Sequence, residues 1–472
     1  MTVTTVDPTT GRPLATYEET TAEELHGLLD RAHSAAKAWR HTPITERANG
    51  LRRLAVALRE RREELASLAT TEMGKPLLES RAEIDKCART CDWYAEHAPA
   101  LLEPETVDTE ALRSVVVPVP LGVLLAIMPW NFPYWQVVRA LAPALAAGNV
   151  MVLKHAPSTT GCALALAEVA DAAGLPSATL SVLVVGADRT AEVAAAVVGD
   201  DRVAAVTLTG STRAGRSVAA IAGQALKKTV LELGGSDAFV VLGDADLDAA
   251  AAWATRSRFQ NTGQSCIAAK RIVVEEQVAD ALTEKLLQHV RALRLGDPIE
   301  EGVTVGPLAR EDLRDALERQ VRESVTQGAR ILIGGRVPDL PGFYYEPTVL
   351  DHVRPGMAVL EEEVFGPAVP LLRARDRTEA LRLANDSVYG LGSAVWTSDL
   401  PAGEEFATRL EAGHTAVNGM TVSDPRLPFG GIKASGYGRE LSHHGLFEFV
   451  NFHAVVVNAA DGPVGDRNTA SE

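Results

Sequence analysis

The sequence predicts an α/β protein built from two domains, each with a parallel β-sheet. Short apolar runs rich in β-branched residues alternate with single helix-length segments from residue 149 to 225, and a second series of this kind follows Cys266. Strands separated by single helices form parallel sheets with helices on both faces. A chain of 472 residues is also too long for one hydrophobic core. Ligands bind such proteins beyond the carboxyl ends of the strands or between domains, so we expect the site there.

The first hundred residues are expected to be helical. Segments 22–39 and 46–72 place apolar residues at helical spacing, and the pattern continues to about His97. Cys87 and Cys91 stand four apart on one face of this region, and we interpret them as helix-packing residues. The run RSVVVPVPLGVLLAIM then reads as two strands joined at Pro120-Leu121-Gly122, which predicts a β-hairpin.

The two alternating series follow this hairpin. The first is expected to form strands at 149–155, 181–186 and 203–210 and helices at 160–174, 189–200 and 211–225. The second is expected to form a helix at 279–293 and strands at 270–276, 330–335, 347–353, 368–374 and 393–398. Residues 459–472 are polar and contain Gly and Pro, which predicts a flexible tail.

Composition excludes several classes of function. The formal net charge of −16 argues against binding to nucleic acid or to an anionic membrane, because both need a basic face. Residues 114–138 carry no charge, but four prolines interrupt them, so we do not expect a transmembrane helix. The four cysteines lack the spacing of a zinc site, and we expect no metal. No signal peptide is visible, so we expect a cytoplasmic protein.

The stretch FQNTGQSC ends in Cys266, which follows a flexible Gly-Gln-Ser turn and precedes an apolar run. One interpretation is a buried cysteine that packs as a small apolar residue, as most lone cysteines do. The other is a nucleophile. The residues around Cys266 do not decide between them.

Two further stretches have the properties of phosphate-binding sites. In TLTGSTRAG, Gly210 allows close backbone approach and Ser211 can cap the helix that follows, whose free N–H groups favour a phosphate. An ordinary strand-to-helix turn also favours these residues, and no GxGxxG fingerprint is present. Lys154 ends a predicted strand, where it could bind a ribose or phosphate or simply be solvated.

Three polar residues stand in otherwise apolar surroundings. Asn131, within PWNFP, suits an oxyanion donor, although a turn asparagine bonded to local backbone is the alternative. Glu232, within LELGG, would have a raised pKa that suits a general base, or it forms a buried ion pair. Arg139 is the only charged residue between Ser114 and Val152 and needs a partner, either a substrate carboxylate or an internal Asp or Glu.

Six motifs together resemble the aldehyde dehydrogenase superfamily in order and spacing, from about Val6 to Val456. They are PWNFP, TGSTRAG, LELGG, FQNTGQSC, EEEVFGP and PFGGIKASGYGRE. The resemblance implies the aldehyde dehydrogenase fold, with two Rossmann-like parallel-sheet domains plus a small β oligomerisation element, and a homodimer or homotetramer. It implies a cofactor-binding domain at 1–101 and 121–234, a catalytic domain at 235–432, and an oligomerisation element at 102–120 and 445–458.

The resemblance also implies roles for individual residues. Cys266 would attack the aldehyde carbon, and Asn131 with the Cys266 N–H would hold the oxyanion. Hydride transfer to the nicotinamide would leave a thioester, which water activated by Glu232 would hydrolyse. Cofactor contacts are implied for Trp130, Lys154, Pro157, Ser158, Gly210, Ser211, Leu233, Glu363 and Phe365, with Glu363 on the nicotinamide ribose.

Within the superfamily, the chain looks most like the shorter bacterial succinate-semialdehyde dehydrogenases. Arg139 matches an arginine that binds the substrate carboxylate in relatives, and Trp135 is expected beside it. Many relatives have a second arginine where this chain has Gln260, so Ser423 or Arg426 is expected to substitute. Relatives with a redox switch carry another cysteine where this chain has Ala268.

The residue three positions after Lys154 bears on cofactor choice. Relatives that prefer NAD often carry a glutamate there, which would repel the 2′-phosphate of NADP, whereas this chain has Pro157. Lys154 and Ser158 could then hold that phosphate, so we expect NADP as cofactor, with NAD possible.

Two other functions remain open on the sequence. One is an aldehyde dehydrogenase for a neutral or aromatic aldehyde, in which Arg139 has a structural role only. The other is a binding or structural protein on the same fold, because a fold alone does not determine an activity. The presence of Cys266, Glu232 and Asn131 together argues against the second.

Overall fold

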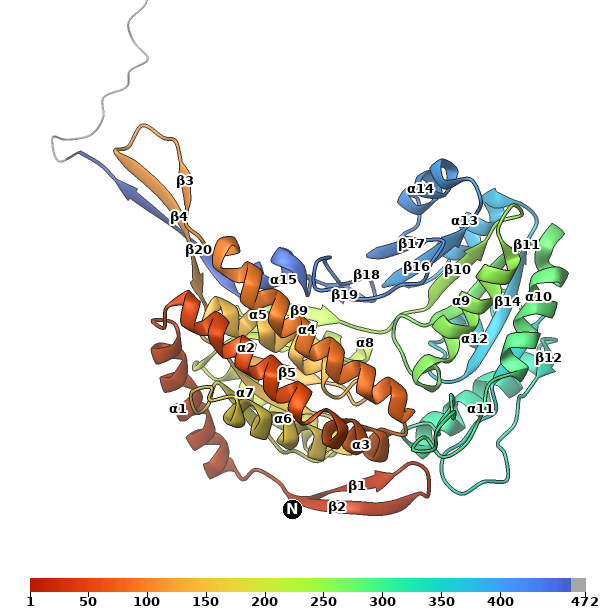
Figure 1. Ribbon diagram of the computed structural model, residues 1–472, viewed down its shortest axis with the longest axis horizontal. Coiled ribbons are helices and arrows are strands. Elements are labelled where there is room, and N and C mark those ends of the chain that lie inside the picture. The colour runs from red at the N-terminus through yellow and green to blue at the C-terminus, as the bar shows by residue number, and fades with distance from the viewer. Residues whose placement is uncertain (460–472) are drawn as a thin grey trace, which may run out of the picture.

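Two open β-sheets carry the fold of the computed structural model, which describes residues 1–459 (Figure 1). The predicted tail, from residue 459 onward, lies outside the described residues apart from Ala459. Four helices precede the first sheet and cover it, as the sequence pattern predicts: α1 (Ala22–Trp39), α2 (Ile44–Glu60), α3 (Arg62–Met73) and α4 (Leu77–Leu101). Cys87 and Cys91 are fully buried on α4, within the first hydrophobic core.

The first sheet has the strand order β19-β9-β8-β5-β6-β7, and only β19 is antiparallel to its neighbour. Its strands are β5 (Val123–Met128), β6 (Val150–His155), β7 (Leu180–Leu183), β8 (Val203–Thr209), β9 (Lys228–Glu232) and β19 (Gly436–Tyr437). Its helices are α5 (Trp135–Ala147), α6 (Thr160–Ala172), α7 (Thr190–Gly199) and α8 (Thr212–Gln224), with a short η1 (Pro157–Thr159). The predicted alternation of strands and helices is confirmed, while α5 was not foreseen.

The second sheet has the order β12-β13-β14-β11-β10-β16-β17 and is parallel except for β12. Its strands are β10 (Asp237–Val241), β11 (Ala269–Glu275), β12 (Arg330–Ile333), β13 (Thr348–Asp351), β14 (Ala368–Ala374), β16 (Gly392–Trp396) and β17 (His414–Val417). Its helices are α9 (Leu247–Phe259), η2 (Gln260–Gly263), α10 (Glu276–Arg291), α11 (Glu311–Thr326), α12 (Ala358–Glu361), α13 (Arg377–Asn385) and α14 (Leu400–Thr408).

The hairpin predicted around Pro120 is wrong. β4 (Arg113–Pro120) pairs with β3 (Glu105–Val107) and with β20 (Val450–Val457), whereas β5 lies inside the first sheet. β5 is apolar on both faces and almost wholly buried, which requires a sheet covered on both sides. β4 is half-exposed, and its two prolines lack the N–H groups that a central strand needs, so it lies in a small separate sheet. We call the part of the molecule built around the first large sheet the first lobe, and the part built around the second large sheet the second lobe. The three-stranded sheet projects from the first lobe (Figure 1).

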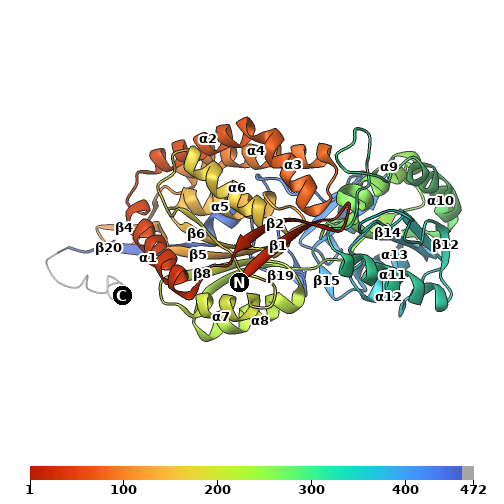
Figure 2. The ribbon, with the colours of Figure 1, turned by 90° about the horizontal axis from the view of Figure 1, so that it is seen from below.

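Three small elements complete the described chain. The hairpin of β1 (Thr2–Asp7) and β2 (Arg12–Glu18), which was not predicted, runs from the first lobe toward the second (Figure 2). Its turn reaches the second lobe, where Pro8 accepts a backbone hydrogen bond from Phe343 (2.9 Å). The other two are the bridge of β15 (Tyr389–Gly390) with β18 (Ile432–Lys433) and helix α15 (Ser442–Phe447). Within residues 1–459, no helix is long and apolar enough to cross a membrane.

Candidate active site

The loop that carries Cys266 turns sharply after α9 and is held by side-chain hydrogen bonds. Asn261 and Thr262 both have left-handed backbone conformations, with φ of 51° and 56°. Such conformations are uncommon outside glycine and persist where surrounding contacts enforce them. The Asn261 side chain supplies two of these contacts, donating to the carbonyl oxygens of Asn131 (2.8 Å) and Gln264 (3.1 Å). The turn therefore presents Cys266 in one position, just ahead of β11.

Cys266 is the one cysteine of the chain that is not fully buried. Lys270, on β11, donates to the Cys266 carbonyl oxygen (2.9 Å) and so fixes the backbone at the candidate nucleophile. Burial raises the pKa of the thiol to about 11, although the nearby cations of Arg139 and Lys270 oppose the rise. The thiol is therefore the resting form at neutral pH, and formation of the thiolate requires a proton acceptor.

Asn131 lies between β5 and α5 and is aligned with the nucleophile loop. Its Nδ2 donates to the carbonyl oxygen of Gln264 (3.1 Å), and its Oδ1 accepts from Gln136 (3.4 Å). These bonds use one of the two N–H groups of the amide and determine which way the other faces. Glu83 holds the loop in place by accepting hydrogen bonds from the backbone N–H groups of Tyr134 and Trp135, at the start of α5 (2.8 Å each). A buried amide held in this way can stabilise an oxyanion without reorganising.

Glu232 ends β9 and is fully buried, yet neither carboxyl oxygen has a hydrogen-bond partner within residues 1–459. Burial raises its pKa well above the ordinary value, and the nearby Glu440 raises it further. Gly430 faces this carboxyl, since a Cβ atom there would lie 2.6 Å from Glu232 Oε1. A buried, unpartnered carboxyl with a raised pKa has the properties of a general base that works near neutral pH.

Arg139 has an internal partner, which was one of the two alternatives that the sequence left open. The guanidinium on α5 forms a buried ion pair with Glu440, donates to Thr209 (3.1 Å) and lies 4.8 Å from the Phe429 ring centroid. Both side chains of the pair are almost completely buried. Arg139 therefore has its counter-charge within the chain. Its position in an apolar stretch does not by itself imply that it binds a substrate carboxylate.

Substituting Arg139 with methionine should lower the free energy of unfolding by about 3–5 kcal/mol, because Glu440 would remain buried without its counter-charge. Urea denaturation of the purified variant measures this. The double variant Arg139→Met/Glu440→Gln should recover most of the loss. A single variant as stable as wild type would mean that Glu440 does not depend on Arg139.

Cys266 opens into a cavity of about 460 Å³ between the two lobes. Trp135, Gln260 and Ser423, the other predicted substrate contacts, line the same cavity, as does Arg139. The alternative from the same loop, Arg426, is exposed, pairs with Asp424 (2.7 Å) and lies outside the lining. The structure thus brings together predicted residues from α5, η2 and the segment before β18.

Four charged residues of α4 that line the cavity were missed by the sequence analysis: Glu79, Glu83, Lys86 and Arg89. Lys86 lines the cavity, and Glu79 does so while accepting the Asn261 backbone N–H (2.6 Å). Burial raises the pKa of Glu79 to about 7. All four lie on an amphipathic helix, where a polar residue is normally a solvent-facing one. Nothing in the local sequence distinguishes these four from the other charged residues of α4.

The predicted phosphate-binding residues lie at the carboxyl ends of β6 and β8. Lys154 is buried at the end of β6, and burial lowers its pKa to about 8. Ser158, in η1, has a buried Oγ atom without a hydrogen-bond partner among residues 1–459. An unsatisfied hydroxyl and a desolvated ammonium four residues apart in the chain fit a phosphate or ribose hydroxyl group. Pro157 stands between them and contributes no charge.

The turn into α8 has the geometry that a dinucleotide requires. Ser211 caps the helix by accepting from the Ala214 backbone N–H (3.2 Å), and the space where a Gly210 Cβ would lie is open apart from Leu208 at 3.7 Å. The exposed helix N-terminus can therefore be approached by an anion. Leu233 packs so closely against Gly215 that a Cβ there would lie 2.5 Å from it.

Glu363 and its neighbours form the other side of this region. Glu363 accepts from the Gly235 N–H (3.1 Å) and pairs with the buried Lys270 (2.5 Å). Trp130 and Phe365 contact each other edge to face, with ring centroids 5.7 Å apart. Lys270 therefore connects Glu363 to the Cys266 carbonyl, a link that the sequence analysis missed.

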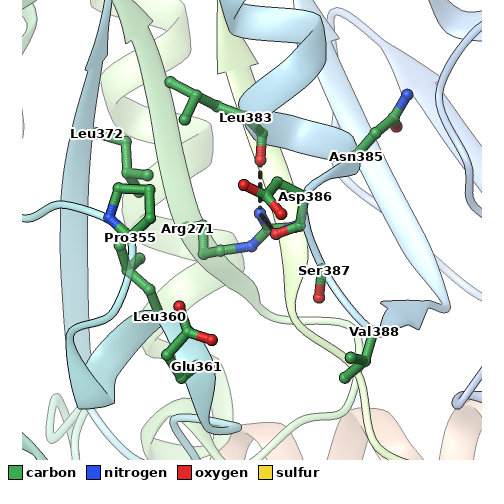
Figure 3. A pocket seen from close by; sticks show the side chains of 10 residues that line it. All are labelled: Arg271, Pro355, Leu360, Glu361, Leu372, Leu383, Asn385, Asp386, Ser387 and Val388. Carbon is green, nitrogen blue, oxygen red and sulfur yellow. Dashed lines mark hydrogen bonds between the residues drawn. The ribbon is translucent and has the colours of Figure 1, made fainter.

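A second cavity, of about 310 Å³, lies beside α13 and is lined by none of the predicted site residues (Figure 3). Arg271 points into it and donates to the carbonyl oxygens of Leu383 (2.8 Å) and Ala384 (2.9 Å), in the last turn of α13. A cation that satisfies a helix C-terminus has a structural role. Across residues 1–459, no group of three His, Cys, Asp or Glu side chains is arranged to hold a metal ion.

Comparison with known proteins agrees with this geometry. Residues 1–455 match the model of the aldehyde dehydrogenase family. The chain is 47% identical to the succinate semialdehyde dehydrogenase [NAD(P)+] Sad of Escherichia coli K12, over 95% of this chain and 96% of that one. It is 45% identical to the probable succinate-semialdehyde dehydrogenase [NADP(+)] of Synechocystis sp. PCC 6803, over 96% and 99%.

A solved structure extends the comparison to three dimensions. The succinic semialdehyde dehydrogenase of Streptococcus pyogenes, crystallised with NADP+, superposes with a TM-score of 0.93 at 36% identity, covering 97% of this chain and 100% of that one. The family match and the shared fold support one conclusion. The chain belongs to the aldehyde dehydrogenase family.

Proposed function

We propose that this enzyme oxidises succinate semialdehyde to succinate and uses NADP as its preferred cofactor, with NAD as a poorer one. The observation that carries the substrate is the Cys266 cavity, which is lined by basic side chains and by the hydroxyl of Ser423. Of its two acidic lining residues, Glu83 is already paired with Lys75. A nucleophile next to a net positive cavity suits a short aldehyde that carries an anion. The names of the most similar relatives support the same substrate.

The first half of the reaction uses Cys266 and Asn131. The Cys266 thiol releases its proton to solvent water, and the thiolate sulfur then bonds to the aldehyde carbon. The carbonyl oxygen becomes an oxyanion, which accepts hydrogen bonds from the free Asn131 N–H and the Cys266 backbone N–H. The bond from Asn131 to the Gln264 carbonyl keeps this donor aligned with the nucleophile.

The second half of the reaction releases the acid. When bound, the nicotinamide cofactor supplies the hydride acceptor, and the substrate carbon is left as a thioester on Cys266. Glu232 then takes a proton from water, whose oxygen attacks the thioester carbon and expels the Cys266 sulfur. The raised pKa of Glu232 suits this step, because the carboxylate is then a strong enough base to activate water.

The proposed NADP site is formed by Lys154, Ser158 and the N-terminus of α8, which would hold phosphate groups, with Glu363 on the nicotinamide ribose. Trp130, Leu233 and Phe365 would pack around the bound cofactor. The unpartnered Ser158 hydroxyl and the buried Lys154 ammonium support the assignment, because each lacks an interaction that a 2′-phosphate would supply.

Substituting Pro157 with glutamate should shift cofactor preference from NADP toward NAD by about 10- to 100-fold in the ratio of kcat/KM values, because a carboxylate there would repel the 2′-phosphate. Steady-state kinetics with each cofactor measures the ratio. Pro157→Gln controls for the loss of the ring without adding charge and should change the ratio much less. An unchanged ratio in the glutamate variant would exclude this explanation of NADP preference.

The substrate assignment is tested by comparing kcat/KM for succinate semialdehyde and for pentanal, a neutral aldehyde of similar length. A preference of at least about 100-fold for the acid is expected if the site binds a carboxylate. Equal rates, or a preference for pentanal or an aromatic aldehyde, would refute the substrate while leaving the family membership intact.

We also propose boundaries for the domains and an oligomeric state. Residues 1–101 and 121–234 form the cofactor-binding domain, residues 235–432 the catalytic domain, and residues 102–120 and 445–458 the oligomerisation element of a homodimer or homotetramer. The exposed face of β20 supports the last, because Phe452 and Val456 are more than half exposed there. Sedimentation equilibrium should give a multiple of the 50.1 kDa chain mass.

The reactive thiol and the four free cysteines support a reducing, cytoplasmic location.

A further inference from the structure

Lys86 reaches from α4 into the Cys266 cavity, where it touches two residues predicted to contact substrate. Its Nζ atom donates to Ser423 Oγ (2.6 Å) and lies 4.1 Å from the centroid of the Trp135 ring. These contacts hold the ammonium group at the cavity wall and leave two of its three N–H groups for other partners. The ammonium, the hydroxyl and the aromatic ring thus form one side of the cavity.

The charge on Lys86 is not balanced by the chain. No carboxylate lies within ion-pairing distance of its Nζ atom among the described residues. Two carboxylates interact with Lys86 electrostatically, but each is already paired with another cation. Glu83 pairs with Lys75, and Asp424 pairs with Arg426. A desolvated ammonium without a counter-charge is unfavourable, so a site of this kind is completed by an anionic ligand.

Three other cations line the cavity: Arg89 and Arg256 are exposed, and the buried Arg139 is in the opposite situation to Lys86. Arg139 forms a buried ion pair with Glu440 and donates to Thr209, so its charge is already neutralised. Gln260 also lines the cavity and brings no charge. Lys86 is therefore the cavity cation that combines partial burial, a hydrogen bond to Ser423 and an uncompensated charge.

We propose that Lys86, together with Ser423, binds the carboxylate of the semialdehyde substrate and sets the preference of the enzyme for acidic aldehydes. The inference rests on the proposed function, since it names the group that recognises that substrate. One carboxylate oxygen accepts from the Lys86 ammonium and the other from the Ser423 hydroxyl, whose own proton is free because it accepts from Lys86.

The surroundings of Lys86 make this recognition sensitive to pH. Burial, together with the nearby Arg139 and Arg89, lowers the pKa of Lys86 to about 8, while Glu83 opposes the shift. Lys86 is charged below this pKa and neutral above it. Affinity for the carboxylate should therefore be lost as pH rises through about 8, and the KM for pentanal should not follow the same curve.

The experiment compares wild type with Lys86→Met, Lys86→Arg and Lys37→Met, using succinate semialdehyde and pentanal at saturating NADP. Lys37→Met is the control, because it removes one positive charge from the exposed side of α1, outside the cavity. Lys86→Met should lose about 10- to 100-fold in kcat/KM for the acid, mostly through KM, and keep its rate on pentanal. Lys86→Arg should retain the preference and move the pH-dependent rise in KM to higher pH.

The outcomes distinguish the proposed substrate from the proposed role of Lys86. A wild-type enzyme without preference for succinate semialdehyde refutes the proposed substrate. A wild-type preference that Lys86→Met retains refutes the role of Lys86 and returns the carboxylate to Arg139 or Gln260. Equal losses on both aldehydes would also refute it, because a merely structural lysine lowers both rates together. Retained activity on pentanal shows that Lys86→Met is folded.

Discussion

Replacing Cys266 with alanine should abolish aldehyde oxidation, lowering kcat by more than about 10⁴-fold, as removal of a covalent nucleophile does in other enzymes. The loss should fall on kcat and leave cofactor binding intact, because the proposed cofactor contacts lie on other segments. Steady-state rates and fluorescence titration with NADP measure the two. A variant that still oxidises succinate semialdehyde at a substantial rate would exclude the thioester route.

Alkylation provides an independent check on the same thiol. Because the other three cysteines are fully buried, iodoacetamide should modify Cys266 alone in the native enzyme. The rate should increase with pH up to about 11, since only the thiolate reacts and its pKa is raised to that value. Cys91→Ala is the matched control and should be alkylated at the wild-type rate. Modification of a second site in the native protein would contradict the burial of the other thiols.

Replacing Glu232 with glutamine should leave the first half of the reaction intact and stop the second. Acylation of Cys266 does not require this carboxylate in the proposed mechanism, whereas hydrolysis of the thioester does. We expect a burst of one NADPH per active site, followed by a steady-state rate about 10²- to 10⁴-fold below wild type. Rapid mixing measures the burst, and mass spectrometry should find a succinyl group on Cys266.

A matched control and the pH dependence sharpen this test. Glu192→Gln removes a surface carboxylate from α7 and should show neither the burst nor the accumulated thioester. In wild type, hydrolysis should slow as pH falls through the raised pKa of Glu232, because protonation removes the base. A Glu232→Gln enzyme that turns over at the wild-type rate would show that another group activates water.

Local patterns in the sequence were enough to predict most strands of both sheets and the helices α6, α7, α8 and α10, whereas the other helices around the two sheets were not predicted beyond the first four. Their periodicities reflect burial of one face or two, and neighbouring residues determine that pattern. The motifs around Asn131, Glu232 and Cys266 likewise depend on short-range requirements, such as the left-handed turn at Asn261 that leads to the nucleophile. The strand and helix patterns are confined to neighbouring residues, so the sequence alone reveals them, whereas the roles at the three motifs are implied by their resemblance to a family.

Contacts between distant segments could not be predicted in this way. β4 and β5 are separated only by Leu121 and Gly122 but belong to different sheets, because the partner strand of β4 comes from the other end of the chain. The hydrogen bond from Lys86 to Ser423 joins residues 337 positions apart. Glu440 forms its ion pair with Arg139 from a segment that is also remote in sequence.

The sequence by itself thus predicted the fold class from local spacing and residue type, and its resemblance to a family implied Cys266 as nucleophile, Glu232 as base and Asn131 as oxyanion donor. Only the tertiary structure decided which cation of the cavity is neutralised and which is not. The reason is electrostatic: the charge that a buried arginine or lysine presents to a ligand depends on every carboxylate within a few ångströms, whatever its position along the chain. On that basis the structure neutralises Arg139 and leaves Lys86 facing the substrate cavity.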